Sequence, residues 1–451
     1  MNARRRKLRG HPGPQPARPA AFCRAFLALA VLCVCAPIRI ARAQTSDNTA
    51  KVAAVKVSGS KRFAEDELAR AIGLAPGTTV TREQIQASAD RLSKLGWFSQ
   101  VSYRFQTNSK GVEIQFTLMD AQCAPVWFDN FPWFTDAEIT AAVRASVALY
   151  DGTAPESGTA LDSIRDAVAG LLKARNIPGE VEGEMVQAPE SEGSIERFRV
   201  LGTDLTVTSL EFSDALAAND PGIKQLLDTI VGKSYSRYAL AAFLGEHVRT
   251  LYVSKGHLRV KFAEPVALFT GDPAKPLRNE IGVRVTIEAG PVYRWGGASW
   301  SGQLALNGAT LDGLLGIKTG DVVDAQELEG GWSRITREYG KRGYLEAKVE
   351  PVPEYDEAQA RVSFKVRVTE GIEYRMGQLS IAGLSLDAER KLLSNWKLPR
   401  GDVFDNSYFD DFVNDGAKKI FKDTPVHFTR VEHLLHPNPQ TKTVDVLLNF
   451  Q

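Results

Sequence analysis

The sequence predicts an α+β protein built as a tandem array of about five small modules. Each module is expected to be a three-stranded mixed sheet with two helices on one face, in the order strand, helix, helix, strand, strand. A repeat carries this prediction: Tyr293 to Gly302 and Tyr374 to Gly383 share Tyr-Arg, Gly, Ser and Gly at one offset of 81 residues. Periods of 3.6 and then 2 in the apolar residues follow in the same order after each copy.

The first 43 residues predict export. They hold nine of the 55 basic residues and no acidic residue, and they contain an apolar run over 25–36 and the small-x-small pattern Ala41-Arg42-Ala43. This combination is typical of a secretory signal peptide, so we expect residues 1–43 to be removed between Ala43 and Gln44. An uncleaved membrane anchor is the alternative.

The charge and cysteine content of the remaining chain limit the partners and disulfides that we expect. This chain keeps 46 basic against 54 acidic residues, a net charge of about −8, which disfavours nucleic acid or an anionic membrane surface as the main partner. Three of the four cysteines leave with the signal peptide, and the last, Cys123, has no partner for a disulfide. Nothing after residue 43 is apolar for long enough to predict a transmembrane helix.

A glycine turn, a short extended piece and a helix cap recur inside the modules. The stretches 74–80, 317–323 and 398–404 resemble one another and precede caps at Thr81, Asp324 and Asp405. The apolar stripes of the helices that follow predict one buried face each. These stripes are Ile85, Ala89 and Leu92; Leu240, Leu244, Val248 and Leu251; and Leu328, Trp332, Ile335 and Tyr339.

Strands that alternate between apolar and polar residues close each unit, as at 361–368 and 444–450. For the second and third units we expect opening strands at 126–128 and 207–212, with helices near 160–175 and 236–252. The predicted modules span residues 51–120, 122–203, 204–290, 291–371 and 372–451.

The first module contains three short motifs: Val55-Lys56-Val57-Ser58-Gly59, Leu74 with Gly77, and Leu92 with Gly96-Trp97-Phe98 and Val101. Through these motifs it resembles the POTRA domain, the polypeptide-transport-associated module in the periplasmic part of BamA-type and TamA-type outer-membrane assembly proteins. The resemblance implies a location in the periplasm, compatible with association to the outer membrane. Because the fifth unit ends at Gln451, the resemblance implies a periplasmic arm without a barrel. A truncated form of a longer barrel protein is the alternative.

An exposed sheet edge is the expected binding feature, because its unpaired backbone groups can accept a strand from another chain. Prolines in or beside the second strands (Pro178, Pro265, Pro351, Pro353 and Pro425) indicate that the second strand is the edge and the third is interior. The candidate polypeptide-binding residues are Ser99, Val101, Tyr103 and Phe105 in the first module and Leu345, Ala347 and Val349 in the fourth. Equally, such prolines can serve to block pairing.

Two further clusters have competing interpretations. The aromatic residues Trp127, Phe128, Phe131, Trp133 and Phe134 suit a sticky surface, but core packing of module two and contact with module one is the favoured interpretation. His433 and His436 have a spacing that suits a metal, but they precede Pro437 without a third ligand, so a solvated loop is expected.

No pattern indicates catalysis or a cofactor: the sequence lacks a phosphate loop, a G-x-S-x-G elbow and an H-E-x-x-H helix. The sequence therefore predicts a non-enzymatic, periplasmic polypeptide-binding protein of outer-membrane protein assembly. Its expected partners are outer-membrane proteins or a β-barrel assembly complex. A structural scaffold or division-type protein that recruits folded envelope partners is the alternative.

Overall fold

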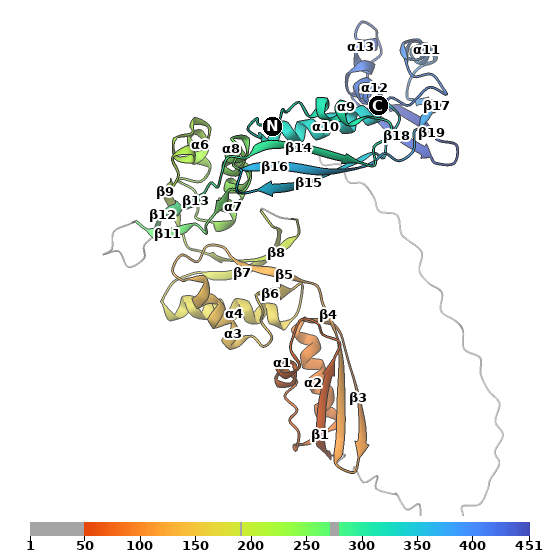
Figure 1. Ribbon diagram of the computed structural model, residues 1–451. Coiled ribbons are helices and arrows are strands. Elements are labelled where there is room, and N and C mark those ends of the chain that lie inside the picture. Colours follow the sequence, from red (N-terminus) through yellow and green to blue (C-terminus); the bar gives the residue numbers. More distant parts are fainter. Residues whose placement is uncertain (1–48, 190–191, 271–278) are drawn as a thin grey trace, which may run out of the picture. The chain divides into compact units, whose positions relative to one another are not determined.

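The repeated order of elements that the sequence predicts is present in the computed structural model, which describes residues 49–189, 192–270 and 279–451 (Figure 1). Several small mixed sheets alternate with helices, which confirms the predicted α+β class. The predicted signal peptide and its cleavage site at Ala43 and Gln44 lie outside the described residues. The proposed module boundaries remain a proposal, and we use them below as names for modules 1 to 5.

The sheets share one topology. In each, the first strand runs parallel to the third, and the third pairs on its other side with the antiparallel second strand. The second strand is therefore at the edge and the third is interior, as the prolines predict. The orders are β2-β1-β4-β3, β6-β5-β8-β7, β11-β12-β9, β14-β16-β15 and β17-β19-β18, with a two-stranded sheet β10-β13 beside the third.

Modules 1 and 2 each carry a short extra strand before the second helix, which pairs with the first strand. In module 1 this strand, Thr79–Thr81, overlaps the extended piece that the glycine-turn repeat predicts. The elements of the two modules are β1 (Thr49–Ser58), α1 (Glu65–Ile72), β2 (Thr79–Thr81), α2 (Arg82–Leu95), β3 (Phe98–Asn108) and β4 (Gly111–Asp120), then β5 (Cys123–Phe128), α3 (Asp136–Ser146), β6 (Thr153–Pro155), α4 (Thr159–Ala174), β7 (Glu180–Gln187) and β8 (Ser194–Leu201).

Module 3 has a second helix interrupted by a π-helical turn. This turn adds a residue to the helical period, so the buried position after Val248 is Tyr252 rather than the predicted Leu251, which is only partly buried. The elements are β9 (Thr206–Phe212), α5 (Ala215–Asn219), α6 (Pro221–Leu226), η1 (Leu227–Thr229), α7 (Arg237–Phe243), η2 (Leu244–Val248), α8 (Arg249–Ser254), β10 (Lys261–Phe262), β11 (Val266–Phe269), β12 (Glu280–Val285) and β13 (Ile287–Glu288).

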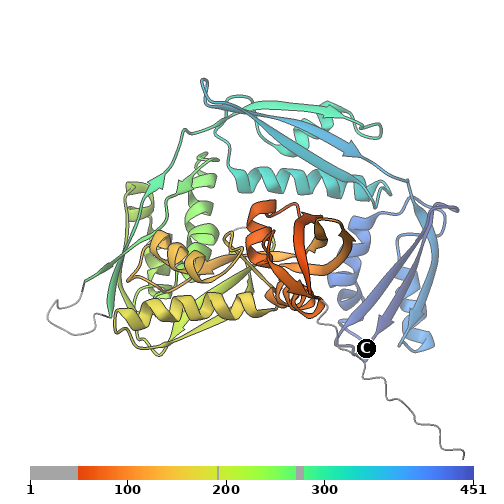
Figure 2. The same ribbon diagram turned by 90° about the horizontal axis from the view of Figure 1, so that it is seen from below.

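Modules 4 and 5 lack the extra strand and keep only a single bridge at the same place, at Val322 and at Val403. Figure 2 shows the long helix α10 lying along one face of the module 4 sheet, where its predicted stripe is buried. The elements are β14 (Arg294–Ser301), α9 (Gly308–Leu315), α10 (Ala325–Lys341), β15 (Lys348–Asp356) and β16 (Arg361–Thr369), then β17 (Arg375–Ala382), α11 (Leu386–Asn395), α12 (Asn406–Asp411), η3 (Phe412–Gly416), α13 (Ala417–Phe421), β18 (Val431–Asn438) and β19 (Thr443–Phe450).

The predicted helix caps are confirmed. The Thr81 side chain accepts the Gln84 N–H, and the Gln84 side chain in return accepts the Thr81 N–H, which completes a capping box. Asp324 and Asp405 accept backbone N–H groups at the starts of α10 and α12. These bonds fix where the second helix starts, and hence where its buried face lies against the sheet.

The apolar cores differ in extent. One continuous core joins modules 1 and 2, whereas modules 3, 4 and 5 each have a separate core. The Trp97 indole N–H also donates to the Ala148 carbonyl oxygen at 3.1 Å, which links the first two modules directly. We infer that modules 1 and 2 behave as one folding unit.

The aromatic cluster of module 2 is mostly packed. Phe128 and Phe131 belong to the core shared by modules 1 and 2, and the Arg175 guanidinium lies over the Phe134 ring at 4.3 Å. Trp133 packs partly against module 3, where its ring centroid lies 6.2 Å from that of Phe269. The favoured core interpretation fits this arrangement, with a contact to module 3 that the sequence did not indicate.

Candidate functional site: the exposed sheet edges

The edge strand β18 of module 5 presents backbone groups that no described strand pairs. Arg430 and Gln451 exchange both backbone hydrogen bonds, N–H to O, at 3.3 and 3.0 Å. In an antiparallel ladder such pairs alternate with pairs whose backbone groups point away from the partner strand. The register of β18 with β19 has no shift, so the N–H and C=O groups of Val431, His433 and Leu435 point outward.

The edge strand β3 of module 1 is longer and contains no proline. Its two-residue turn to β4 closes with the pair Asn108 and Gly111, which is a hydrogen-bonded pair in hairpins of this type. Counting back along the ladder, the outward backbone groups belong to Val101, Tyr103, Phe105 and Thr107. Three of these are predicted binding residues.

The fourth predicted residue of module 1, Ser99, has a different role. It is the extra residue of a bulge between Phe98 and Gln100 and has no partner on β4 in the register. Its hydroxyl donates toward the Met119 and Asp120 carbonyl oxygens at 3.2 and 3.3 Å. Ser99 therefore marks the start of the open edge.

Two of the three residues predicted for the edge strand of module 4 lie outside that strand. Leu345 and Ala347 precede β15, because a turn follows the helix stop at Gly343 before the strand begins at Lys348. Their side chains are partly buried: Leu345 packs against the core of module 5, and Ala347 packs against that of module 4. Of the three, Val349 alone lies on the edge strand.

Prolines close the middle of that edge. Pro351 and Pro353 of β15 lack an N–H group and so cannot occupy the hydrogen-bonding pairs to β16; their positions face outward. An approaching strand would find donors at Val349 and Tyr355 but none between them. In module 4 the blocking interpretation of the edge prolines fits best.

In module 5 the second strand starts later than the sequence predicts. Pro425 lies outside it, and the strand spans Val431–Asn438, so the predicted solvated loop around His433 and His436 is wrong. Being three residues apart on a strand, His433 and His436 point to opposite faces and cannot share a metal.

Module 3 covers part of the edge of module 2. The Tyr238 hydroxyl donates to the Gln187 carbonyl oxygen of edge strand β7 at 2.9 Å, and the Arg197 guanidinium lies 4.6 Å from the Tyr238 ring centroid. Asp129 accepts the Tyr238 N–H at 2.8 Å and the Ser236 hydroxyl at 3.0 Å. Burial raises the pKa of Asp129, although these bonds favour its charged form.

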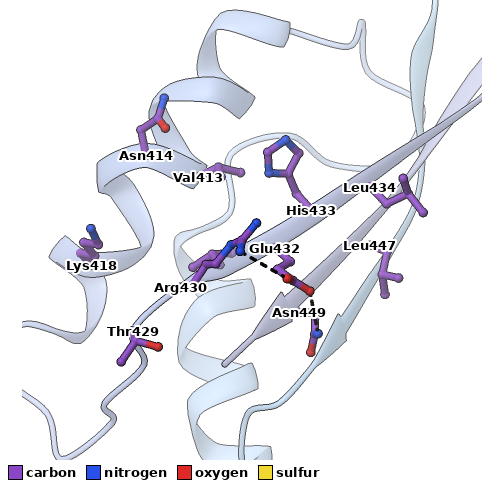
Figure 3. A pocket seen from close by; sticks show the side chains of 11 residues that line it. Val413, Asn414, Lys418, Thr429, Arg430, Glu432, His433, Leu434, Leu447 and Asn449 are labelled. Atoms are coloured by element: carbon purple, nitrogen blue, oxygen red, sulfur yellow. Dashed lines mark hydrogen bonds and ion pairs between the residues drawn. The ribbon is translucent and has the colours of Figure 1, made fainter. Parts of the chain in front are cut away.

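A groove of about 680 Å³ runs beside β18 (Figure 3). One wall is the helical segment η3–α13, with Val413, Asn414 and Lys418, and the other is the strand with Arg430 and its neighbours. Glu432 in the groove already accepts hydrogen bonds from Asn449 and Gln451 and lies 3.8 Å from Arg430. None of the helix-side residues of this groove was identified from the sequence.

The corresponding side of module 1 has different chemistry. The Tyr103 hydroxyl donates to Gln86 Oε1 of α2 at 2.8 Å, and Gln86 Nε2 donates to Asp90 Oδ1 at 2.7 Å. Helix α2 thus presents an amide and a carboxylate beside the β3 edge. Phe105 is 42% exposed and the rest of the strand toward the turn is exposed.

Other chemistry is sparse in the described part of the chain. Among residues 49–189, 192–270 and 279–451, no three His, Cys, Asp or Glu side chains are grouped so as to hold a metal ion. Over the same ranges no helix combines the length and apolar character needed to cross a membrane. Cys123 is partly buried and accepts a hydrogen bond from Arg62 at 2.6 Å, at the junction of modules 1 and 2.

Comparison with known proteins identifies two regions. Residues 50–119 and 293–371 match the family model of the POTRA domain, described as "Surface antigen variable number repeat". They correspond to modules 1 and 4, the modules with the longest edge strands.

Two curated proteins align with more than half of the chain. A Treponema pallidum protein, provisionally named an outer membrane protein assembly factor, is 23% identical over 268 residues, covering 58% of this chain and 31% of that protein. Outer membrane protein assembly factor BamA of Neisseria meningitidis is 20% identical over 263 residues, covering 54% and 32%. The chain thus spans about a third of the length of these curated relatives.

Solved structures with similarity include POTRA domains 3–5 of BamA from Haemophilus influenzae. The TM-score is 0.39 at 18% identity, covering 55% of this chain and 96% of that one. The N-terminal domain of Omp85 from Thermosynechococcus elongatus has a TM-score of 0.20 at 13% identity, covering 71% and 97%.

Proposed function

Since the chain carries POTRA domains at residues 50–119 and 293–371, we propose that it is a periplasmic polypeptide-binding protein of outer-membrane protein assembly or translocation. It binds an extended segment of a client by strand addition at its open sheet edges. The row of outward backbone groups on β3 and β18 is the observation that carries this proposal. The names of the two curated relatives, both assembly factors, support the pathway.

Strand addition suits a protein with many clients. Each main-chain hydrogen bond contributes a net ~0.5–1.5 kcal/mol, and its geometry does not depend on the client sequence. Val101, Tyr103, Phe105 and Thr107 on β3 would together exchange both their donors and their acceptors with an added strand. Of the residues predicted in module 4, Val349 retains an outward donor, but the two prolines that follow it make β15 the weaker edge.

The absence of catalysis is part of this proposal. The function needs only backbone pairing and side-chain contacts, and no step in it forms or breaks a covalent bond. The partners we propose are outer-membrane proteins in transit or a β-barrel assembly complex, met in the periplasm or at the outer membrane.

Hydrogen exchange on the purified chain tests the proposal directly. An unfolded outer-membrane protein, freshly diluted from urea, should slow amide exchange in β3 and β18 when it binds. The chain should in turn slow the aggregation of this client. The folded form of the same client serves as the control. Protection of neither edge would overturn strand addition, and capture of the folded form alone would support the scaffold alternative.

A further inference from the structure

We propose that the β18 groove, defined by Val413, Asn414, Lys418 and residues 429–434 with Leu447 and Asn449, selects extended segments that carry a carboxylate. The carboxylate would pair with Lys418, and apolar residues before and after it in the segment would lie on the opposite face. This inference rests on the proposed strand addition and names the class of segment that this edge takes.

The register of an added strand places one set of its side chains toward the helix. Directly paired residues of neighbouring strands point to the same face of a sheet. His433 points to the helical face, where its ring centroid lies 5.4 Å from that of Phe409 in α12. A residue added beside His433 would therefore project toward the helical wall that carries Asn414 and Lys418 (Figure 3).

The helical wall carries a spare positive charge. Lys418 is exposed, and within the described ranges its ammonium group has neither an ion pair nor a hydrogen bond. The nearest acid on the same segment, Asp415, is engaged by Lys419 at 2.8 Å. Asn414 is likewise exposed and offers an amide N–H beside the same space.

The acid inside the groove is already satisfied. Glu432 accepts from Gln451 Nε2 at 2.9 Å and from Asn449, and Arg430 approaches it to 3.8 Å while remaining 73% exposed. Among the residues that line the groove, an incoming basic side chain would therefore find no unpaired carboxylate, whereas an incoming carboxylate finds the Lys418 ammonium group. Charge complementarity favours an acidic residue at this place.

The outer face of the same edge is apolar. Leu434 and Leu447 are directly paired across β18 and β19 and are 51% and 37% exposed. Residues adjacent to the carboxylate in the added strand would project over this pair, because successive side chains of a strand alternate between faces. The preferred segment thus has an acidic residue flanked by apolar ones.

A polypeptide fits this site better than an anionic lipid. The outward N–H and C=O groups of Val431, His433 and Leu435 form an evenly spaced row of donors and acceptors, which a second backbone matches and a lipid headgroup does not. Lipid binding and pairing with a second copy of this chain are distinguishable outcomes of the following test.

The test uses the whole exported chain and three eight-residue peptides of alternating Thr and Val, with Asp, Asn or Lys at one central Thr position. Anisotropy of a labelled peptide gives affinity, and hydrogen exchange at residues 431–435 reports strand addition. We expect the Asp peptide to bind about 3- to 10-fold more tightly than the Asn peptide at low salt, the range of a partly exposed ion pair. High salt should reduce this preference.

Matched variants separate the effect of the Lys418 charge from that of strand addition at β18. K418Q should bring the Asp and Asn peptides to equal affinity while β18 protection persists. K391Q, which removes an exposed cation of α11 outside the groove, should leave the preference intact. Equal affinities for Asp and Asn in the unmodified chain, with β18 protected, would overturn the selectivity and leave strand addition standing.

The remaining outcomes of this test would each overturn the inference. If no peptide protects β18, strand addition fails at this edge and the inference falls with it. Binding to phosphatidylglycerol vesicles that K418Q abolishes, without β18 protection, would assign the groove to lipid instead. Protection of β18 that grows with protein concentration in the absence of peptide, together with dimers in light scattering, would assign it to a second copy.

Discussion

The edges of modules 1 and 5 offer the same backbone geometry and opposite flanking charge. Beside β3, helix α2 presents Gln86 and Asp90, and Tyr103 bridges strand and helix. Beside β18, the helical wall presents Lys418 and Asn414, and Pro437 is the second-last residue of the strand. In the proposed strand addition, the main chain of such a module supplies binding in general, while the second helix decides which segments bind.

Module 4 adds a third case. Its edge strand is nearly as long as that of module 1, yet Pro351 and Pro353 remove two consecutive outward donors. The sheet edge of such a module can thus be open, as in modules 1 and 5, or interrupted by prolines, as in module 4, through changes at a few residues that leave its core intact.

The largest expected effect comes from closing an open edge. H433P removes the central outward donor of β18 without touching a ladder bond to β19, so peptide affinity at this edge should fall about tenfold or more. Anisotropy titration measures the loss, and F105P is the equivalent change in module 1. H433T, which keeps the N–H, is the control. Unchanged affinity in H433P would show that peptide does not pair with β18.

Opening the closed edge is the converse experiment. Replacing Pro351 and Pro353 together by Val restores both outward donors of β15, and we expect new peptide binding there or pairing between chains. Hydrogen exchange over residues 348–356 would reveal either result. Substituting Pro437 by Val at the end of β18 is a milder comparison. If the double variant shows no new protection, the flanking segments, rather than the prolines, close this edge.

A charge exchange in module 1 should transfer the selectivity. D90K replaces the carboxylate beside β3 with an ammonium group, so the Asp peptide should gain about 3-fold over the Asn peptide at this edge. The ratio of the two affinities, measured in the H433P background, isolates module 1. D66K, on the far helix α1, should leave the ratio unchanged. A ratio of one in D90K would confine charge selection to module 5.

The smallest effect concerns the core that module 1 shares with module 2. Burial opposes ionisation of Asp151, but hydrogen bonds from Arg62 (2.7 Å) and Thr153 (2.9 Å) prevail and lower the pKa of this carboxyl. A lowered pKa stabilises the folded state above the ordinary value near 3.9, and this stabilisation is lost as the pH falls through the lowered value.

D151N should therefore destabilise modules 1 and 2 by about 1 kcal/mol at pH 7, with the difference shrinking below about pH 4. Urea titration followed by hydrogen exchange of β1 and β8 reports both modules, and the two should lose protection together. D166N, at an exposed carboxylate of α4, is the control. A difference that does not depend on pH would mean that the Asp151 charge is not the cause.

Much of the fold was readable because local signals repeat. The caps at Thr81, Asp324 and Asp405, the stripes of the second helices and the proline-marked edges each follow from short stretches of sequence. The predictions were wrong where an element departed from its regular helical period or from its expected start. The π-helical turn in module 3 moved the buried position to Tyr252, and the late start of β18 turned a predicted loop into the candidate edge.

By itself the sequence determined the order of elements and, where prolines lie in or beside the second strand, indicated that this strand is the edge, since periodicity, caps and proline act within a few residues. Only the tertiary structure decided which backbone groups point outward and which side chains flank them. Which backbone groups of an edge strand point outward depends on which residue pairs are hydrogen-bonded, such as Arg430 with Gln451. The groove depends on the packing of helix against strand, which places Lys418 and His433 in its lining. Both arise between residues distant in sequence, where no local pattern records them.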